Sequence, residues 1–136
     1  MREFLFSVVS AERTVLETRA ISVTLPGAVG SYGVYGGHVP MVTELAIGTI
    51  EYRTADQKEG VLSISGGFAE VLPDRVVVLA DTAELGAELD LDRARTAMQR
   101  VQEMLDKAPN EEERAELRLS LERARARIKA IEKSEH

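Results

Sequence analysis

The spacing of apolar residues changes near Leu89, and this change constrains the fold more than any other feature of the chain. Upstream, short runs alternate apolar with polar residues, so that Ile21, Val23 and Leu25 share one side of a strand. Downstream, apolar residues recur at steps of three and four, which is the period of an α-helix. The sequence therefore predicts a β domain followed by helices.

Many short strand-like runs fill residues 3–83. They are rich in Val, Ile, Leu, Thr and Tyr, and they are separated by Pro26-Gly27, Gly36-Gly37, Gly66-Gly67 and Pro73-Asp74. These pairs are typical turn residues. Strands at roughly ten-residue spacing favour a β-sandwich or a flattened barrel, and we predict such a domain over residues 1–86.

Two amphipathic helices are expected in residues 87–136. Their apolar stripes are Leu91, Ala94, Met98, Val101 and Leu105 in the first, and Leu117, Leu121, Ala124, Ile128 and Ile131 in the second. Pro109 ends the first helix, and Asn110 with Glu113 forms a capping-box-like start for the second. The short connection predicts an antiparallel hairpin. Because each stripe is narrow and buries little apolar area, we expect the hairpin to be marginally stable and to dock or open easily.

Composition excludes several functional classes. The 136-residue chain has a net charge of −6 and no cysteine, which rules out disulfides, thiolate nucleophiles and cysteine-ligated zinc. The acidic excess lies in residues 1–89 and aromatic residues are scarce, so we expect no nucleic-acid partner. No segment approaches the roughly 18 apolar residues of a membrane span, and the N-terminus lacks a signal-peptide pattern. We therefore expect a cytoplasmic protein that does not insert into a membrane but can dock onto a membrane-bound complex.

The glycine-rich segment GSYGVYGGHVP, residues 30–40, is a candidate ligand loop. It lacks the Lys-Ser/Thr pair of a P-loop and the spacing of a dinucleotide fingerprint, which favours a hairpin with glycines at positive φ. His38 has no neighbouring nucleophile or orienting acid, so a structural or interface role is favoured. Without a catalytic constellation or a multi-histidine metal site, we expect the chain not to be an enzyme.

The junction between the two parts is acidic. Its carboxylates are Asp81, Glu84, Glu88, Asp90 and Asp92. Their spacing matches no calcium loop, and carboxylates are favoured at the positive end of a helix. A helix N-terminus is therefore the preferred interpretation of this cluster.

Four arginines of the predicted helices form another candidate site. Arg93 and Arg100 project from one face about two turns apart, and Arg123 and Arg127 share a face at i, i+4. If the hairpin closes, these four guanidinium groups can surround one polyanion, with planar donors that suit phosphate oxygens. The alternative is that they are solvated and paired with carboxylates, namely Glu103, Glu116 and Glu122.

Five motifs, in this order and spacing, carry a family resemblance: SVVSAER, GSYGVYGGHVP, LSISGGFAEV, VVVLADTAE and LDLDRARTA. Along essentially its whole length the chain resembles the epsilon subunit of bacterial F-type ATP synthases. It departs from the family pattern at Ser31, where an acidic residue is common, and at Gly36, where a proline is common.

The resemblance implies a non-catalytic rotor subunit in the central stalk of a proton-translocating ATP synthase. The β-sandwich would bind the gamma subunit and the c-subunit ring, peripherally at the cytoplasmic face of the cell membrane. Ser31 and Tyr32 would face the c ring, and His38, Val42 and Thr43 would face gamma. The hairpin would fold against the sandwich or extend towards the alpha/beta catalytic ring and inhibit ATP hydrolysis.

The resemblance also implies a regulatory ligand. Some bacterial epsilon subunits bind ATP on the folded hairpin through an Ile/Leu-Asp-x-x-Arg-Ala motif, which LDLDRA matches. Carried over, the residues that recognise adenine are Glu84, Leu89, Asp90 and Ala94, and those that meet the phosphates are Arg93, Arg100, Arg123 and Arg127. No cofactor is required on this interpretation. The rival hypothesis is a stand-alone adaptor whose β domain and hairpin join other proteins.

Overall fold

The computed structural model describes residues 2–135 of the chain. The strands are β1 (Phe4–Val9), β2 (Thr14–Ala20), β3 (Ser22–Gly27), β4 (Gly30–Tyr35), β5 (Met41–Arg53), β6 (Glu59–Leu72), β7 (Arg75–Ala80) and β8 (Ala83–Leu85). A single 3-10 turn, η1 (Gly86–Glu88), leads to the helices α1 (Leu91–Asp106) and α2 (Glu111–Ser134).

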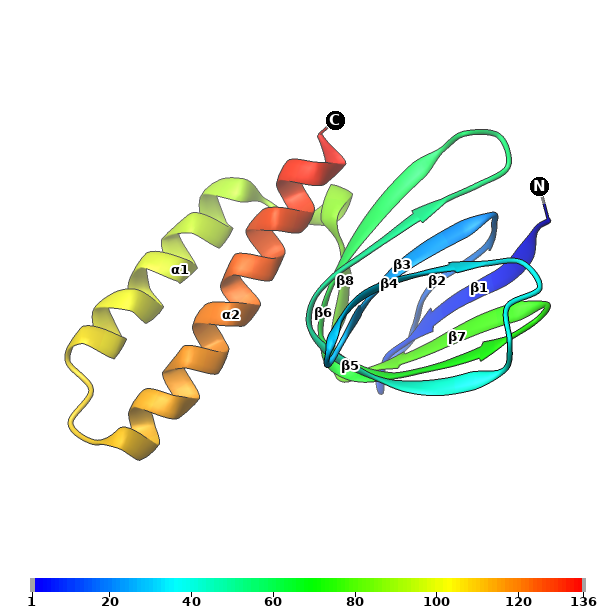
Figure 1. The fold of residues 1–136 in the computed structure, drawn as a ribbon. Coiled ribbons are helices and arrows are strands. Elements are labelled where there is room, and N and C mark those ends of the chain that lie inside the picture. Colours follow the sequence, from blue (N-terminus) through cyan, green and yellow to red (C-terminus); the bar gives the residue numbers. More distant parts are fainter. Residues whose placement is uncertain (1, 136) are drawn as a thin grey trace.

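The strands form a sheet that folds over on itself. Its order is β2-β1-β7-β6-β5-β3-β4, with β8 paired to β6, and every pair is antiparallel except β1 with β7. Strands β5 and β6 have 13 and 14 residues and pair along their length. Figure 1 shows that these two long strands curve from one layer of the sandwich into the other. The predicted fold, a flattened β-sandwich followed by two helices, is confirmed.

Strand β6 exchanges its inner and outer sides where it passes between the layers. Leu62 and Ile64 face the core in its first half, whereas Ala69 and Val71 face the core in its second half. Two side chains seven residues apart, Leu62 and Ala69, would lie on opposite sides of an uninterrupted strand. The exchange falls at Gly66 and Gly67, whose φ angles of 98° and 138° are accessible to glycine and strained for other residues.

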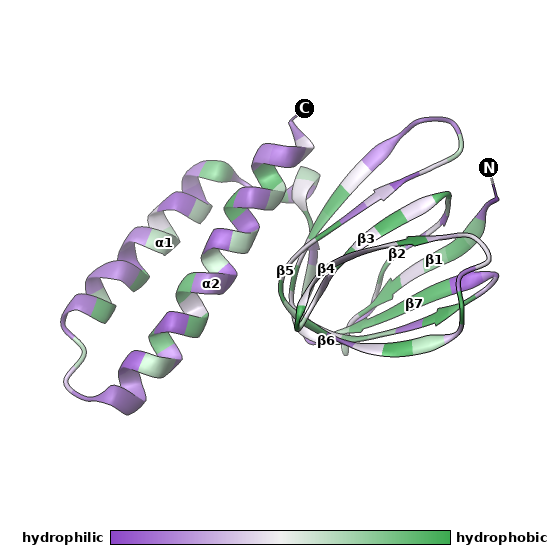
Figure 2. Ribbon diagram, viewed as in Figure 1, coloured by the Kyte–Doolittle hydropathy of each residue, from purple (hydrophilic) through white to green (hydrophobic). Residues whose placement is uncertain are grey.

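The core of the sandwich consists of large side chains that are almost completely removed from solvent. Phe4, Phe6, Ile50 and Leu62 are all 1% exposed or less, and the Phe6 ring lies 5.6 Å from that of Tyr52. Figure 2 shows the contrast with the helices, which are mostly hydrophilic with isolated apolar bands. The alternating pattern of the sequence thus produces one well-filled core.

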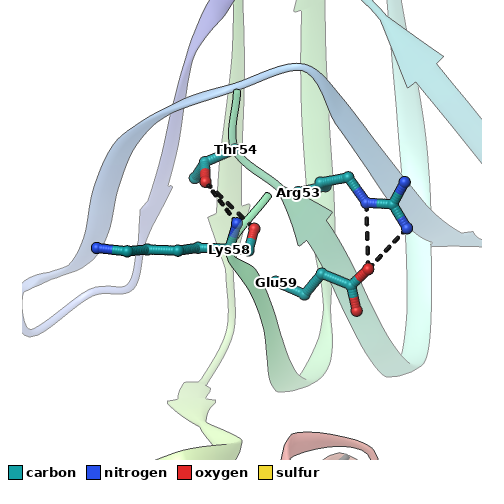
Figure 3. Close-up of polar contacts among 4 residues, drawn as sticks. All are labelled: Arg53, Thr54, Lys58 and Glu59. Carbon is teal, nitrogen blue, oxygen red and sulfur yellow. Dashed lines mark hydrogen bonds and ion pairs between the residues drawn. The ribbon is translucent and has the colours of Figure 1, made fainter. Parts of the chain in front are cut away.

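The turn between β5 and β6 is fixed by its own polar groups (Figure 3). The Thr54 N–H donates to the Lys58 carbonyl at 2.8 Å, and the Lys58 N–H donates to Thr54 Oγ1 at 3.1 Å. Arg53 and Glu59 pair across the two strands at 2.6 Å. Gln57 has a φ of 68°, a left-handed conformation that is uncommon for a residue with a side chain.

The two helices form the predicted antiparallel hairpin, and Asn110 caps the second helix as predicted. Asn110 Oδ1 accepts from the Glu113 N–H at 2.9 Å, and Asp90 Oδ1 accepts from the Arg93 N–H at 3.1 Å. Figure 1 shows α2 between α1 and the sandwich, with the hairpin loop pointing away from the sheet. Across residues 2–135, neither helix is long and apolar enough to cross a membrane.

Candidate interfaces and ligand site

Arg93 and Arg100 lie on the same face of α1, as predicted. Together with Asp92, Thr96 and Ala97 they line an open groove of about 420 Å³. All of these residues come from α1, so the groove brings together two of the four arginines and none from α2. Two guanidinium groups beside a threonine hydroxyl offer donors that suit phosphate oxygens.

Arg127 lies at the junction of α2 with the β domain instead. Its Nε donates to Glu84 Oε1 at 2.7 Å, and both side chains are more than a third exposed, at 39% and 36%. Glu84 belongs to β8, so the pair joins the helix to the sheet. Two residues predicted for opposite ends of ATP, the adenine and the phosphates, therefore contact one another in this structure.

Within the described part of the chain, the other three arginines have no such carboxylate partner. Within residues 2–135, no carboxylate oxygen lies within 4.0 Å of the guanidinium nitrogens of Arg93, Arg100 or Arg123. The pairing with Glu103, Glu116 and Glu122 that the alternative interpretation predicted is therefore absent among the described residues, whereas the solvation that it predicted holds for Arg93 and Arg100. Arg123 is half-buried on α2, whereas Arg93 and Arg100 are exposed.

Three of the four residues predicted to recognise adenine lie at the start of α1, whereas the fourth, Glu84, lies on β8. Asp90 is the N-cap of α1, Leu89 is half-buried between η1 and α1, and Ala94 is buried. Ala94 is the one buried residue described in α1, and α1 packs mainly against α2. The predicted role of these residues in recognising adenine stays a prediction.

Ser31 and Tyr32 differ sharply, although both were predicted to face the c ring. Ser31 is exposed on β4, an edge strand of the sheet, whereas Tyr32 packs partly against the core. The Tyr32 hydroxyl donates to Met41 Sδ, and its ring centroid lies 6.3 Å from that of His38. The structure thus joins the predicted c-ring segment to the start of the predicted gamma segment.

Val42 and Thr43, both predicted to face gamma, lie on opposite sides of β5. Val42 is 69% exposed on the outer side, whereas Thr43 is half-buried and pairs in register with the buried Ala69. Consecutive residues of a strand alternate sides, so one flat partner surface cannot contact both side chains equally.

Two exposed apolar residues that the sequence interpretation missed lie beside Val42. Phe68 on β6 and Leu79 on β7 are direct cross-strand partners, and they are 54% and 57% exposed. Val42 lies diagonally across from Phe68, because Phe68 pairs with Glu44. We call Val42, Phe68 and Leu79 the apolar row. The sequence gives only a weak signal of it, because β7 carries apolar residues on both sides, Val77 and Leu79 on one and Val76 and Val78 on the other.

A polar cleft of about 490 Å³ lies where the end of α2 meets the β domain. It is lined by Glu51, Arg53 and Glu59 from β5 and β6, and by Glu88 and Lys133 from the helical side. The two basic side chains of this cleft already form ion pairs, because Lys133 pairs with Glu51 at 2.9 Å and Arg53 pairs with Glu59. Burial raises the pKa of the Tyr52 hydroxyl, which also lines this cleft, above its ordinary value.

Outside these regions the shifted carboxylates have local causes. A hydrogen bond from Thr54 lowers the pKa of Asp56, and the Arg118 guanidinium lowers the pKa of Glu111. Within the described residues no group of three or more His, Asp and Glu side chains is placed to hold a metal ion.

A curled β-sandwich with a weakly packed helical hairpin and an exposed apolar row defines a two-domain subunit built for contact with other proteins. Comparison with known proteins identifies the family. The model for the ATP synthase delta/epsilon chain β-sandwich domain matches residues 3–86, and the model for the long α-helix domain of the same chain matches residues 87–132. The chain belongs to the ATP synthase delta/epsilon family, and the resemblance stated above is confirmed.

Individual relatives agree along most of the chain. The ATP synthase epsilon chain of Moorella thermoacetica is 40% identical over 123 residues, covering 90% of this chain and 92% of its own. The epsilon chain of Desulfitobacterium hafniense (strain Y51) is 43% identical over 128 residues, covering 93% and 95%. Epsilon chains are non-catalytic subunits of the synthase, which agrees with the expectation that this chain is not an enzyme.

Solved structures share the fold. A chain in the cryo-EM structure of the Euglena gracilis mitochondrial ATP synthase has a TM-score of 0.81 at 24% identity, covering 98% of this chain and 82% of its own. One in the central stalk and c ring of the Tetrahymena thermophila enzyme has a TM-score of 0.62 at 13% identity, covering 96% and 97%.

Proposed function

We propose that this chain is the central-stalk rotor subunit that joins the gamma subunit to the c ring of an F-type ATP synthase. The observation that carries the proposal is the match of both family domains, in order, along residues 3–132. The Euglena relative with the same fold was solved together with F1 and a c ring. In this role the chain transmits rotation between proton translocation and ATP synthesis.

The apolar row is the surface that we assign to gamma. Exposed apolar side chains on neighbouring strands are favourable anchors for a protein partner, because docking removes them from water. The end of the sandwich around Ser31 and Tyr32 is assigned to the c ring, whereas His38, Val42 and Thr43 stay assigned to gamma. Attachment through the c ring places the chain peripherally at the cytoplasmic face of the membrane.

Binding to gamma can be tested by co-purification. Phe68→Glu and Leu79→Glu place a charge in the apolar row, so each is expected to weaken capture by the gamma subunit by roughly tenfold or more. Leu119→Glu is the matched control, because Leu119 is an exposed apolar residue, 41% accessible, on α2. Full capture of both sandwich variants would show that the apolar row is not part of the interface with gamma.

The hairpin is assigned a regulatory role, in which it inhibits ATP hydrolysis when it leaves the sandwich and extends towards the alpha/beta ring. The support for this role is the shallow packing of α1, in which Ala94 is the one buried residue described. An element held by so little apolar burial can populate two arrangements. Reconstituted F1 is expected to hydrolyse ATP faster with residues 1–86 than with the full chain, and equal rates would contradict the assignment.

ATP is proposed as the ligand that biases the hairpin towards its closed form. The support is the groove that places Arg93 and Arg100 together, with no carboxylate on either guanidinium in residues 2–135. Arg93→Ala is expected to weaken ATP binding about tenfold in a calorimetric titration, since a hydrogen bond to a charged group is lost. Arg95→Ala is the control, because Arg95 is exposed on the same helix and does not line the groove. Equal affinities of the two variants would exclude this groove.

A further inference from the structure

The hairpin touches the β domain through the second half of α2. The buried residues of this helix are Leu121, Ala124, Ala126, Ala130 and Ile131. α2 packs against β5, β6 and η1, whereas α1 packs mainly against α2. Figure 1 shows the same arrangement, with the C-terminal end of α2 beside the sandwich and the hairpin loop far from it. Closure therefore depends on one end of one helix.

The helix α2 approaches the backbone of η1 closely at Gly86. A Cβ on Gly86 would lie 2.5 Å from the Ala130 carbonyl oxygen and would also collide with Ser134 Oγ. Ser134 in turn donates to the Ala130 carbonyl at 2.7 Å. The last turn of α2 thus rests directly on the backbone of η1, at a distance that any side chain at position 86 would prevent.

An ion pair fixes the same turn to the sheet. Lys133 Nζ lies 2.9 Å from Glu51 Oε2, and the two side chains are 36% and 44% exposed. Half-exposed pairs contribute little energy alone, so the pair acts mainly by fixing the position of the turn over β5. The apolar part of the contact comes from Ala130 and Ile131, which are 0% and 3% exposed.

We propose that the last turn of α2, residues 130–134, is a clasp that holds the hairpin closed on the sandwich in the absence of any ligand. Its seat on the β domain consists of Gly86 and Glu51. The clasp lies outside all the residues predicted to bind ATP. The clasp and the Arg127–Glu84 pair are separate contacts of the closed hairpin, so a ligand that engages Arg127 leaves the clasp in place. The regulatory meaning of the clasp rests on the proposed function, whereas the clasp itself is a property of the isolated chain.

Because the chain has no cysteine, spin labels attach only to cysteines that are introduced at chosen positions. Glu70→Cys on β6 and Glu122→Cys on α2 are exposed positions outside the clasp, and the distance between the labels reports closure. The full chain without nucleotide is expected to give one narrow distribution. A chain that ends at Lys129, and Gly86→Ala in the full chain, are expected to broaden it and shift it to longer distances.

Charge reversal keeps the test independent of folding. Lys133→Glu is expected to increase the open fraction, and the double variant Glu51→Lys with Lys133→Glu is expected to restore the parent distribution. Lys129→Glu, an exposed residue on the same part of α2 without an ion-pair partner in residues 2–135, should leave it unchanged. Narrow distributions in both the shortened chain and Gly86→Ala would overturn the clasp. Capture by gamma, measured separately, tests the proposed function and does not depend on this result.

Discussion

The β domain and the helical hairpin bury their apolar residues in different ways. The sandwich removes large side chains such as Phe4, Phe6 and Leu62 from water almost completely. The hairpin has one buried residue in α1, Ala94, and three of the five buried in α2 are alanines. Full burial of a Phe or Leu side chain is worth about 1.5–3 kcal/mol, and a single methyl only about 0.8 kcal/mol. We therefore expect the sandwich to stay folded under conditions in which the hairpin opens.

The polar contacts between the two regions do not reverse this conclusion. Arg127–Glu84 and Lys133–Glu51 are the two ion pairs that join α2 to the sheet, and their side chains are all more than a third exposed. Pairs of this kind contribute about 0–1 kcal/mol each. Opening the hairpin should therefore require much less free energy than unfolding the sandwich.

The largest effect is expected in the core of the sandwich. Phe6→Ala removes a side chain that is 0% exposed, and it should lower the free energy of unfolding by about 3–5 kcal/mol because it leaves a cavity. Urea denaturation measures this change. Leu119→Ala, on the exposed side of α2, is the control and should shift the free energy by less than about 0.5 kcal/mol.

A smaller and more local effect is expected at the hairpin. Ile131→Ala removes a side chain that is 3% exposed at the end of α2, and it should destabilise the closed hairpin by roughly 2 kcal/mol. Amide exchange in α1 and α2 should accelerate accordingly, while exchange in β1 and β7 stays as in the parent. Equal acceleration in the strands would mean that the hairpin and the sandwich unfold together.

The cap of α2 is the next test. Asn110→Ala removes the acceptor of the Glu113 N–H and should lower helix stability by about 1 kcal/mol. The change should appear as faster amide exchange in the first turn of α2. Asn110→Asp keeps the acceptor and should retain the protection of the parent.

A substitution in the turn between β5 and β6 is expected to raise stability instead of lowering it. Gln57 has a positive φ, so Gln57→Gly relieves backbone strain and should stabilise the sandwich by roughly 0.5 kcal/mol, after the greater freedom of glycine in the unfolded chain is subtracted. Thermal unfolding of the β domain measures the gain. A loss of stability would show that the Gln57 side chain makes a contribution greater than the strain.

The smallest effect concerns pH at the exposed start of α2. Arg118 lowers the pKa of Glu111 in the folded chain. Because the folded pKa is depressed, the pair stabilises above the unfolded pKa of Glu111, and this contribution is lost as the pH falls through the folded pKa. Arg118→Ala should move the pKa of Glu111 up towards its ordinary value in a carboxyl NMR titration, and an unchanged pKa would exclude the pair.

Local patterns predicted the elements of this protein well. The period-two runs gave strands, the steps of three and four gave the hairpin, and Asn110 was correctly placed as a cap, because each depends on residues near one another in sequence. The exchange of sides at Gly66 and Gly67 could not be predicted, since it depends on how β6 passes between layers. The apolar residues Phe68 and Leu79 were missed because both sides of these strands carry apolar residues, so the alternation alone does not show which side is exposed.

Contacts between distant segments were also beyond the sequence pattern. The prediction that Glu84 and Arg127 belong to one site rested on the family resemblance, and their direct ion pair joins residues 43 positions apart. The sequence equally could not show that α2, and not α1, packs on the sandwich, because both helices carry similar apolar stripes. The ATP-binding role of the four arginines stays a prediction.

Native-state hydrogen exchange of the isolated chain, followed residue by residue, tests the central claim most directly. The account predicts that amides of α1 and α2 exchange through a common opening that leaves β1, β6 and β7 protected, so that the helices exchange orders of magnitude faster than the core strands. Protection of the helices equal to that of the strands would contradict it, because the hairpin would then be part of one cooperative unit and could not open alone.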